Sequence, residues 1–413
     1  MLDFDREIDG LHADLIALCG DLVSADSINP PGATAEMARR VSNWLGERGV
    51  PAEIVRRDDQ APNVVSRIAC GRPGRHVVFN AHMDTMPPGD EALWSVPPLA
   101  LTRRDGRAYG LGMGNMKGAL AGMCLVAWLV HRHAPALAGT LSLTAVSDEV
   151  MFGDRGTIYL LQQMPELAGD FLISGEGPGY MDLAVAEKGL LWLDIDVTGA
   201  GGHSSNALAG KTAAIVLARF LAAVDLLNDR YARVPPELPG VSGGDGNLGF
   251  RLSVNVGALR GGGVRSQIAT LASAELDIRL PPGIGTTEVE DAIRQCAPDG
   301  SGIVLRRVKG WDANWTDVES PLVQAATSAI IAVRGAAPRN VVRLPGSDAR
   351  QWRDRGVPAI CYGPQPTLSS GVDDHAAEQD LLDCTKVYAR TALALMASSP
   401  QQDSFVENPR RRC

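Results

Sequence analysis

The stretch from His76 to Pro88 reads HVVFNAHMDTMPP. It begins with the apolar run Val77 to Phe79, which is typical of a buried strand, and then turns polar. The polar part carries His82 and Asp84, so we expect this pair at the carboxyl end of a strand, where open α/β sheets keep their sites. A His-x-Asp pair can place the imidazole on a metal while the carboxylate orients it. Taken alone, the pair fits a solvated turn equally well.

Strands and helices alternate on both sides of this stretch. In chain order, the residue patterns predict a helix between residues 32 and 49, two strands of which the second covers 76–81, a helix over 118–131, a strand over 140–146, a helix over 156–164 and a strand over 171–174. Alternating strands and helices indicate an α/β layer with a largely parallel sheet.

The pattern changes near Leu190, where apolar and polar residues begin to alternate as in a sheet with unlike faces. The elements predicted from there are a strand over 190–197, a helix over 211–228, strands over 252–259 and 272–280, a helix after Gly285 and a strand over 303–308. This order describes a ferredoxin-like α+β module. The α/β pattern then resumes with a helix after Pro321, a strand over 359–362 and a final helix from Glu378. We therefore expect an α/β domain formed by residues 1–188 and 310–413, with an inserted domain over 189–309.

Composition excludes several classes of protein. The 413 residues carry a formal charge of −9, and the absence of a basic cluster outside residues 410–412 argues against nucleic acid as a partner. The seven cysteines are scattered and form no C-x-x-C, which fits neither a disulfide framework nor a thiolate zinc site. The acidic start shows no signal peptide, and the longest apolar run, Ala119 to Val130, is too short to span a bilayer. We expect a cytoplasmic protein with no membrane partner.

Five further places carry polar residues suited to chemistry, and each follows a predicted strand or lies in a loop bounded by glycines. They are GLGMGNMKG (110–118), SDEV (147–150), GEG (175–177), TGAGGHSS (198–205) and DDH (373–375). The first matches neither the P-loop nor the dinucleotide fingerprint, because Asn115 and Met116 stand where a glycine is required. For SDEV alone, an ordinary solvated turn is the default interpretation.

Together with AHMDTMP and PGSDAR, these motifs resemble, in their order and separations, the metallopeptidase and amidohydrolase family of the aminoacylases. That family also holds acetylornithine deacetylase, succinyl-diaminopimelate desuccinylase and glutamate carboxypeptidase. The resemblance covers nearly the whole chain. It implies a zinc-exopeptidase-like catalytic domain with a mostly parallel central sheet, interrupted by a lid domain through which such enzymes usually form homodimers.

The resemblance implies a role for each matching residue. His82 and Glu176 resemble ligands of a first metal, and Asp84 resembles the orienting partner of His82. Glu149 matches the general base that deprotonates the metal-bound water. His203 resembles the lid histidine that binds substrate and stabilises the oxyanion, often across the dimer interface.

Three residues near the C-terminal end complete the candidate site. His375 corresponds to the histidine of a second metal. Asp348 and Arg350, both in PGSDAR, either contact the carboxylate of a substrate or simply close a loop. Contact through Arg350 is reasonable because the planar guanidinium fork suits carboxylates.

Two positions depart from the family pattern. Asn115 stands where the family has an Asp that bridges two metals, and Val150 stands where it has a Glu that binds the second metal. A neutral amide is a poor bridge between two dications, and Val cannot act as a ligand. We therefore expect one Zn²⁺ or Mn²⁺ ion per chain, held by His82 and Glu176 together with Asn115 or His375.

A shift of the alignment by one residue is the alternative. Asp148 would then be the base and Glu149 a metal ligand, which would retain more of a second site. We favour the first alignment because the shift misplaces the family's Asp-Glu pair.

These assignments predict a metal-dependent hydrolase that cleaves a C–N bond in a small substrate bearing a carboxylate, with Glu149 as the general base. The resemblance favours an amide, as in an N-acyl amino acid or a dipeptide. The altered ligands leave open hydrolytic deamination of an aromatic amine, as in 5-nitroanthranilate aminohydrolase. A second alternative is a family member that binds a metabolite without turnover.

Overall fold

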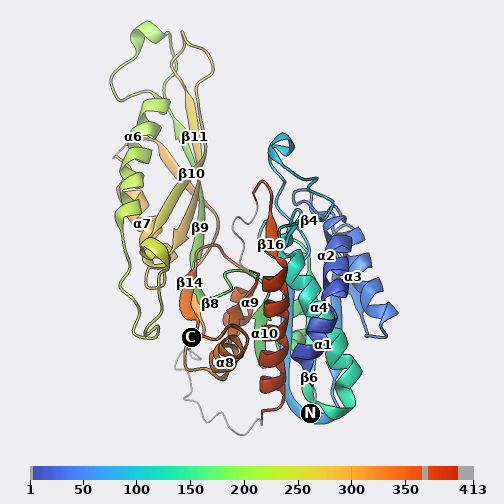
Figure 1. The fold of residues 1–413 in the computed structure, drawn as a ribbon. Coiled ribbons are helices and arrows are strands. Elements are labelled where there is room, and N and C mark those ends of the chain that lie inside the picture. The colour runs from blue at the N-terminus through green and yellow to red at the C-terminus, as the bar shows by residue number, and fades with distance from the viewer. Residues whose placement is uncertain (1–2, 299, 365–370, 399–413) are drawn as a thin grey trace. The chain divides into compact units, whose positions relative to one another are not determined.

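The computed structural model describes residues 3–298, 300–364 and 371–398. Its residues form two compact units. Unit 1 comprises Met1–Ala184, Thr316–Arg339 and Ser347–Cys413, and unit 2 comprises Val185–Trp315 and Asn340–Gly346. An α/β unit is thus interrupted by an inserted unit with its own sheet, which confirms the predicted fold class (Figure 1).

A mixed sheet forms the centre of unit 1. Its strand order is β1-β2-β6-β3-β7-β15-β8, and β8 continues into unit 2 and also pairs with β13 and β14. The bounds are β1 (Glu53–Val55), β2 (Asn63–Ala69), β3 (Arg72–His82), β6 (Ala138–Val146), β7 (Phe171–Ser174), β8 (Asp182–Glu187), β13 (Asn314–Trp315), β14 (Arg339–Arg343) and β15 (Ala359–Cys361). The four strands β6, β3, β7 and β15 are parallel, whereas β1, β2 and β8 pair in the antiparallel sense.

A small antiparallel sheet and the helices complete unit 1. The small sheet contains β4 (Thr102–Arg104), β5 (Arg107–Tyr109) and β16 (His375–Ala377). The helices are α1 (Phe4–Gly10), α2 (His12–Val23), α3 (Ala35–Glu47), α4 (Gly118–His133), α5 (Thr157–Gln163), α8 (Pro321–Arg334), α9 (Ala349–Arg353) and α10 (Glu378–Met396). Short turns of helix include η2 (Met113–Lys117), η3 (Ala134–Ala136) and η4 (Pro165–Ala168).

Helix α4 lies in the core of unit 1 and packs against α10 (Figure 1). Glycines at 118 and 122 permit this approach, because a Cβ atom at Gly118 would lie 2.6 Å from Leu381 and one at Gly122 would lie 2.5 Å from Thr385.

The helical stretch Met113–Ala136 is longer than the apolar run in the sequence, and among the described residues it alone is long and apolar enough to cross a membrane. However, 89% of its most apolar window is buried in the protein, which accounts for its composition.

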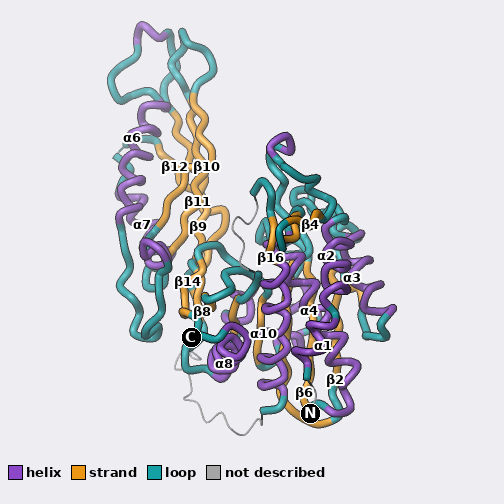
Figure 2. Tube along the Cα trace, in the orientation of Figure 1, coloured by secondary structure: helices purple, strands orange, loops and turns teal. Residues whose placement is uncertain are grey.

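Unit 2 contains a four-stranded antiparallel sheet in the order β10-β11-β9-β12. Its elements are β9 (Gly189–Thr198), α6 (Ala213–Asp225), β10 (Ser253–Gly261), β11 (Leu271–Leu280), α7 (Thr286–Gln295) and β12 (Ile303–Trp311). Both helices cover the same face of the sheet (Figure 2), and the apolar residues of β9 that alternate with polar ones are buried beneath them. This is the element order predicted from the sequence.

Candidate metal centre

The carboxyl ends of three neighbouring parallel strands carry the candidate site. His82 is the last residue of β3, Glu149 lies in the loop after β6, and Glu176 lies in the loop after β7. The strand ends are level, because His82 pairs with Val146, the last residue of β6. The ligating atoms of His82, Glu149 and Glu176 lie within 4.8 Å of one another, and all three residues are buried. The sheet thus brings together three residues that are far apart in sequence.

One nitrogen of His82 is directed at the two carboxylates. His82 Nδ1 donates a hydrogen bond of 2.7 Å to the backbone carbonyl oxygen of Asp84, so Nε2 is the nitrogen that can bind a cation once it has lost its proton. His82 Nε2 lies 3.5 Å from Glu176 Oε1 and 3.8 Å from Glu149 Oε2. Two ligands at about 2.0–2.1 Å from a tetrahedral zinc ion lie roughly 3.4 Å apart. The spacing of His82 and Glu176 therefore suits a shared cation.

Asp84 holds the loop that carries Glu149. Its carboxylate accepts hydrogen bonds from the backbone N–H groups of Glu149 and Val150, at 3.2 and 3.0 Å, and from Asn29 Nδ2 at 2.8 Å. The same carboxylate lies 3.7 Å from His82 Nδ1. Asp84 therefore orients His82 through its backbone carbonyl and positions Glu149 through its side chain. The His-x-Asp pattern predicted instead that the carboxylate orients the imidazole.

The carboxylates of the site are crowded in a buried environment. Burial raises the pKa of Glu149 well above its usual range, and the charges of Glu176, Asp348 and Asp84 add to the rise. Burial likewise raises the pKa of Asp348 to about 7. A pKa rises in this way when the negative form is poorly stabilised. The cluster therefore favours an added positive charge.

The pKa of His82 responds to the same charges. Burial alone would lower it, but the Glu176, Glu149 and Asp84 carboxylates raise it to about 10. Within the described residues, His82 Nε2 and Asn115 Oδ1 are buried polar atoms without a hydrogen-bond partner. Such atoms are rare in folded proteins, and a bound ion is one explanation for them. The imidazole and the two carboxylates that converge here fit a divalent cation.

Metal binding is expected to release protons. Because the pKa of His82 is raised to about 10, its imidazole is protonated near neutral pH, and a cation must displace that proton. The apparent metal affinity should therefore weaken as the pH falls below that value. Calorimetric titration with Zn²⁺ or Mn²⁺ in buffers of different ionisation enthalpy measures the number of protons released. A His203→Ala variant should release the same number, and release of none by the unaltered protein would contradict the prediction.

Asn115 lies in η2, next to the end of β3. The contact comes through its neighbour Met116, whose sulfur accepts a hydrogen bond of 3.2 Å from the backbone N–H of His82. A Cβ atom at Gly175 would lie 2.9 Å from the Met116 methyl group, so the side chain of Met116 packs between the loops that carry His82 and Glu176. The neighbour of Asn115 in the sequence thus contacts the end of β3 and the loop after β7.

His375 is the first residue of β16 and is not among the three residues whose ligating atoms converge. It pairs with Tyr109 of β5, just before the glycine-rich loop 110–118. The carboxylate of Asp374 accepts hydrogen bonds from the N–H groups of Gly112 and Gly114, at 2.8 and 2.9 Å. The segment with His375 is thus fastened to the loop that carries Asn115.

The remaining predicted residues have different surroundings. Asp348 precedes α9, accepts a hydrogen bond of 2.7 Å from Thr157 Oγ1 and acts electrostatically on Glu149. Arg350, within α9, makes an ion pair of 3.1 Å with Asp354.

His203 belongs to unit 2, is exposed and makes a hydrogen bond of 2.8 Å with Ser205 Oγ through Nδ1. Its backbone forms an antiparallel bridge with Gln267. His203 is not part of the convergent group of His82, Glu149 and Glu176.

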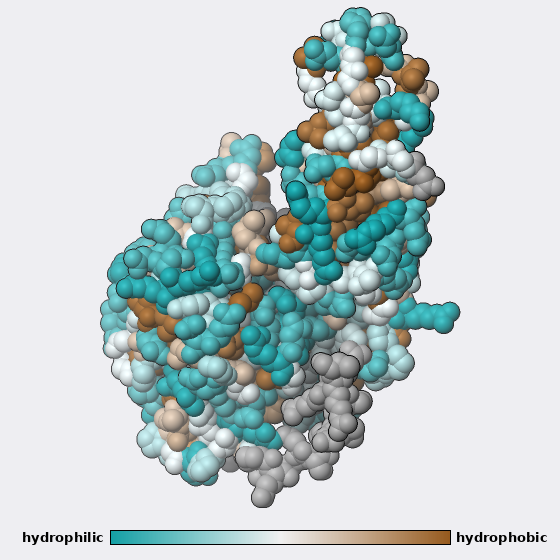
Figure 3. Space-filling view, turned by 180° about the vertical axis from the view of Figure 1, so that it is seen from behind, coloured by the Kyte–Doolittle hydropathy of each residue, from teal (hydrophilic) through white to brown (hydrophobic). Residues whose placement is uncertain are grey.

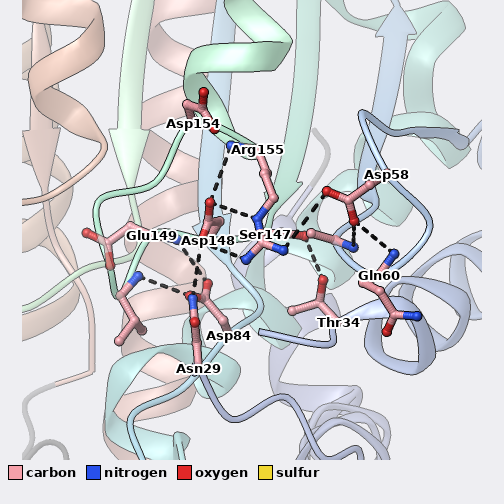
Figure 4. A network of polar contacts seen from close by, with 12 residues as sticks. Asn29, Thr34, Asp58, Gln60, Asp84, Ser147, Asp148, Glu149, Asp154 and Arg155 are labelled. Carbon is pink, nitrogen blue, oxygen red and sulfur yellow. Dashed lines mark hydrogen bonds and ion pairs between the residues drawn. The ribbon is translucent and has the colours of Figure 1, made fainter. Parts of the chain in front are cut away.

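The structure also bears on the alternative alignment. Asp148, the base in the shifted alignment, directs its carboxylate at Arg155, with distances of 3.0 Å to Nε and 2.9 Å to Nη2 (Figure 4). Asp148 is not part of the convergent group, whereas Glu149 is. Two contacts of this region, from Asn29 and Arg155, were not singled out from the sequence, because neither residue lies in a recognisable motif.

The chain is similar to known proteins over most of its length. Residues 78–394 match the peptidase family M20/M25/M40. The chain is 26% identical over 395 residues to a succinyl-diaminopimelate desuccinylase of Bradyrhizobium sp. (strain ORS 278), a match that covers 91% of this chain and 97% of that protein. It is also 26% identical over 281 residues to an acetylornithine deacetylase of Vibrio campbellii, which covers 66% of this chain and 70% of that protein.

Two solved structures share the fold. Human carnosine dipeptidase 1 has a TM-score of 0.76 at 15% identity, covering 95% of this chain and 98% of that chain. The YXEP protein of Bacillus subtilis, described as a dinuclear metal binding peptidase from the M20 family, has a TM-score of 0.66 at 14% identity, covering 94% and 99%. At these identities the likeness concerns the fold.

Proposed function

The chain belongs to the M20/M25/M40 peptidase family, and we propose that it is a metal-dependent hydrolase that cleaves the amide bond of a small substrate bearing a carboxylate, with Glu149 as the general base. The observation that carries the proposal is the convergence of His82, Glu149 and Glu176 at the ends of three parallel strands. Relatives named as a desuccinylase and a deacetylase support an amide of an amino-acid derivative as the substrate class.

Each residue has a defined task in this proposal. His82 and Glu176 would hold the cation, with Asn115 or His375 as a further ligand. A divalent cation, when bound, supplies a Lewis acid that polarises a carbonyl group and acidifies water. Glu149 accepts the proton of the attacking water at its carboxylate and delivers it to the leaving nitrogen. Because Asp84 holds the Glu149 loop by two backbone hydrogen bonds, the base is positioned before substrate arrives.

We infer that one metal ion, Zn²⁺ or Mn²⁺, works in each chain. Val150 offers no ligand where relatives bind a second ion, and Asn115 offers only a neutral oxygen. Protein loaded with either metal should therefore contain about one ion per chain. At a free metal concentration 100 times the Kd, binding should raise the free energy of unfolding by about 2.7 kcal/mol. Elemental analysis and thermal unfolding measure both quantities, and two tightly bound ions would favour a dinuclear site as in the relative from Bacillus subtilis.

The substrate is best identified with a panel of N-acyl amino acids, dipeptides, carbamoyl compounds and aminobenzoates. We expect turnover of the amides.

Val150 favours the second candidate, deamination of an aromatic amine, because an apolar side chain replaces an acid beside the base. Turnover of aminobenzoates alone would support that candidate, and metal-loaded protein that turns over none of these compounds would support a metabolite-binding role.

We propose that Asp348, Arg350 and His203 contact the substrate and that the chain forms a homodimer through unit 2. Unit 2 has apolar surface (Figure 3), and its exposed apolar side chains include Leu208 and Leu259. Sedimentation analysis tests the dimer, and a monomer at working concentration would contradict it.

A cytoplasmic location is supported by the cysteines, because all six in the described residues are free.

A further inference from the structure

Arg155 is joined to Asp148 by a two-pronged ion pair (Figure 4). Its Nε and Nη2 atoms donate to the two carboxylate oxygens at 3.0 and 2.9 Å, and its backbone N–H donates to the same carboxylate at 3.4 Å. Asp148 is 7% exposed and the Arg155 side chain is 26% exposed, so the pair is partly buried and is screened by salt less than a pair at the surface. A guanidinium and a carboxylate in this geometry fix each other in orientation as well as in distance.

Asp148, the residue just before Glu149, has an uncommon backbone conformation. Asp148 has a φ of 64°, in the left-handed region that costs free energy for residues other than glycine, so its surroundings must maintain it. The loop closes behind it, where the N–H of Gly153 donates to the carbonyl oxygen of Asp148 at 2.8 Å. A Cβ atom at Gly153 would lie 1.8 Å from Asp148 Oδ2. The glycine therefore leaves the room that the carboxylate needs to reach Arg155.

The other side of the loop is held by Asp84. Asn29 connects the two acids, since its Nδ2 atom donates to Asp84 Oδ2 at 2.8 Å and to Asp148 Oδ1 at 3.4 Å. Figure 4 shows the resulting chain of contacts from Arg155 through Asp148 and Asn29 to Asp84. Glu149 directly follows Asp148, and its backbone N–H donates to Asp84, so both acids hold the loop next to this residue.

We propose that Arg155 is a positioning residue, which acts through Asp148 to hold the loop in the conformation that brings Glu149 to His82 and Glu176. The inference rests on the proposed function, because the position of Glu149 matters most if it is the base. In the contacts of the described residues, the Arg155 side chain touches none of His82, Glu149 and Glu176, so its effect on the site is indirect.

A merely structural role for Arg155 is distinguishable. Its backbone carbonyl accepts a hydrogen bond of 2.9 Å from Asn63 Nδ2, and Asn63 Oδ1 accepts one of 2.9 Å from the N–H of Ser147. These contacts anchor the loop through the backbone and remain when the side chain is shortened. A change of the Arg155 side chain therefore tests its hold on Asp148 while leaving that anchor in place.

The test is Arg155→Ala compared with Arg57→Ala. Arg57 makes an ion pair with Asp154, which belongs to the same loop as Asp148. Arg57 does not pair with Asp148 itself, so its variant is a matched control. Arg155→Ala should lower kcat about 10- to 100-fold, the effect typical of residues that orient metal-site groups, and should weaken Mn²⁺ binding, with KM close to that of the control. Tm should fall below that of the control, because the buried Asp148 carboxylate loses its partner, so recovery of kcat with added guanidinium is the readout that separates positioning from loss of stability. Arg155→Lys should recover little of the kcat, because an ammonium group cannot make the two-pronged pair.

Added guanidinium, at concentrations well below those that unfold the protein, should restore part of the kcat of Arg155→Ala, whereas ammonium should not. A loss of activity that guanidinium does not restore and that parallels a loss of Tm would overturn the positioning role. So would a kcat equal to that of Arg57→Ala.

Hydrogen exchange keeps the inference separate from the proposed function. The amides of Glu149 and Val150 donate to Asp84, so they report the loop position without any turnover. They should exchange faster in Arg155→Ala than in Arg57→Ala, and equal rates would refute the inference whatever the enzyme does. Unaltered protein that neither binds metal nor hydrolyses the panel would contradict the proposed function alone.

Discussion

Glu149→Gln is expected to lower kcat by about 10²- to 10⁴-fold while the protein still binds its metal. The amide has the shape of the carboxylate but cannot accept a proton, so the loss falls on the chemical step. The amide oxygen can still face His82, and the backbone hydrogen bond from residue 149 to Asp84 is unaffected. Steady-state kinetics and metal analysis of the same preparation measure both effects. Glu166→Gln, at an exposed position in unit 1, is the matched control and should behave as the unaltered protein.

The result also decides between the two alignments. If Glu149 were a ligand and Asp148 the base, Glu149→Gln would weaken metal binding, and Asp148→Asn would abolish turnover with the metal retained. If Asp148 acts only through the loop, Asp148→Asn should resemble Arg155→Ala and keep part of its activity. An unchanged kcat in Glu149→Gln would remove Glu149 from the mechanism.

His82→Ala should abolish tight metal binding and, with it, hydrolysis. Residues that only orient a metal ligand typically contribute 10- to 100-fold to affinity or activity, so loss of a direct ligand should exceed about 100-fold. The rise in unfolding free energy on adding Zn²⁺ or Mn²⁺ should disappear as well. Metal analysis, kcat and thermal unfolding measured with and without metal check these effects.

His76→Ala is the control for this variant. His76 lies on the same strand, β3, where its ring makes a hydrogen bond of 2.8 Å with Ser142, away from the strand end that carries His82. It should lose some stability and keep the metal. Retention of stoichiometric metal by His82→Ala would show that other residues hold the ion.

Local pattern in the sequence predicted most of the elements, because a buried strand such as β7 and an amphipathic helix such as α3 each bear a periodic mark. The first two helices were missed. α2 is apolar on more than one face, being buried among other elements, and so lacks a clear helical period. Nor does local pattern say which strands are neighbours. The two strands expected in succession, β2 and β3, are separated by β6.

The order of the motifs along the sequence is enough to select His82, Glu149 and Glu176 as candidate site residues. The structure adds that these three residues converge. The supporting contacts could not be predicted in that way. The hold of Arg155 on Asp148 depends on the path of a loop, and the link from Asn29 to Asp84 joins segments that only the folded chain brings together. His82 Nδ1 is at hydrogen-bond distance from the backbone carbonyl oxygen of Asp84 and not from its carboxylate. This contact depends on local backbone geometry, which the sequence pattern does not predict.

The interruption of unit 1 has a consequence for biosynthesis. β15 lies between β7 and β8, and α10 packs against both α4 and α8, so unit 1 needs residues from near both ends of the chain. The sheet of unit 2, built from consecutive strands, can form as soon as it leaves the ribosome. Until β15 and α10 emerge, the open edge of β7 and the apolar surface of α4 are exposed to other molecules in the cell. The strands that carry His82, Glu149 and Glu176 precede unit 2 in the sequence, whereas the elements that cover β7 and α4 follow it.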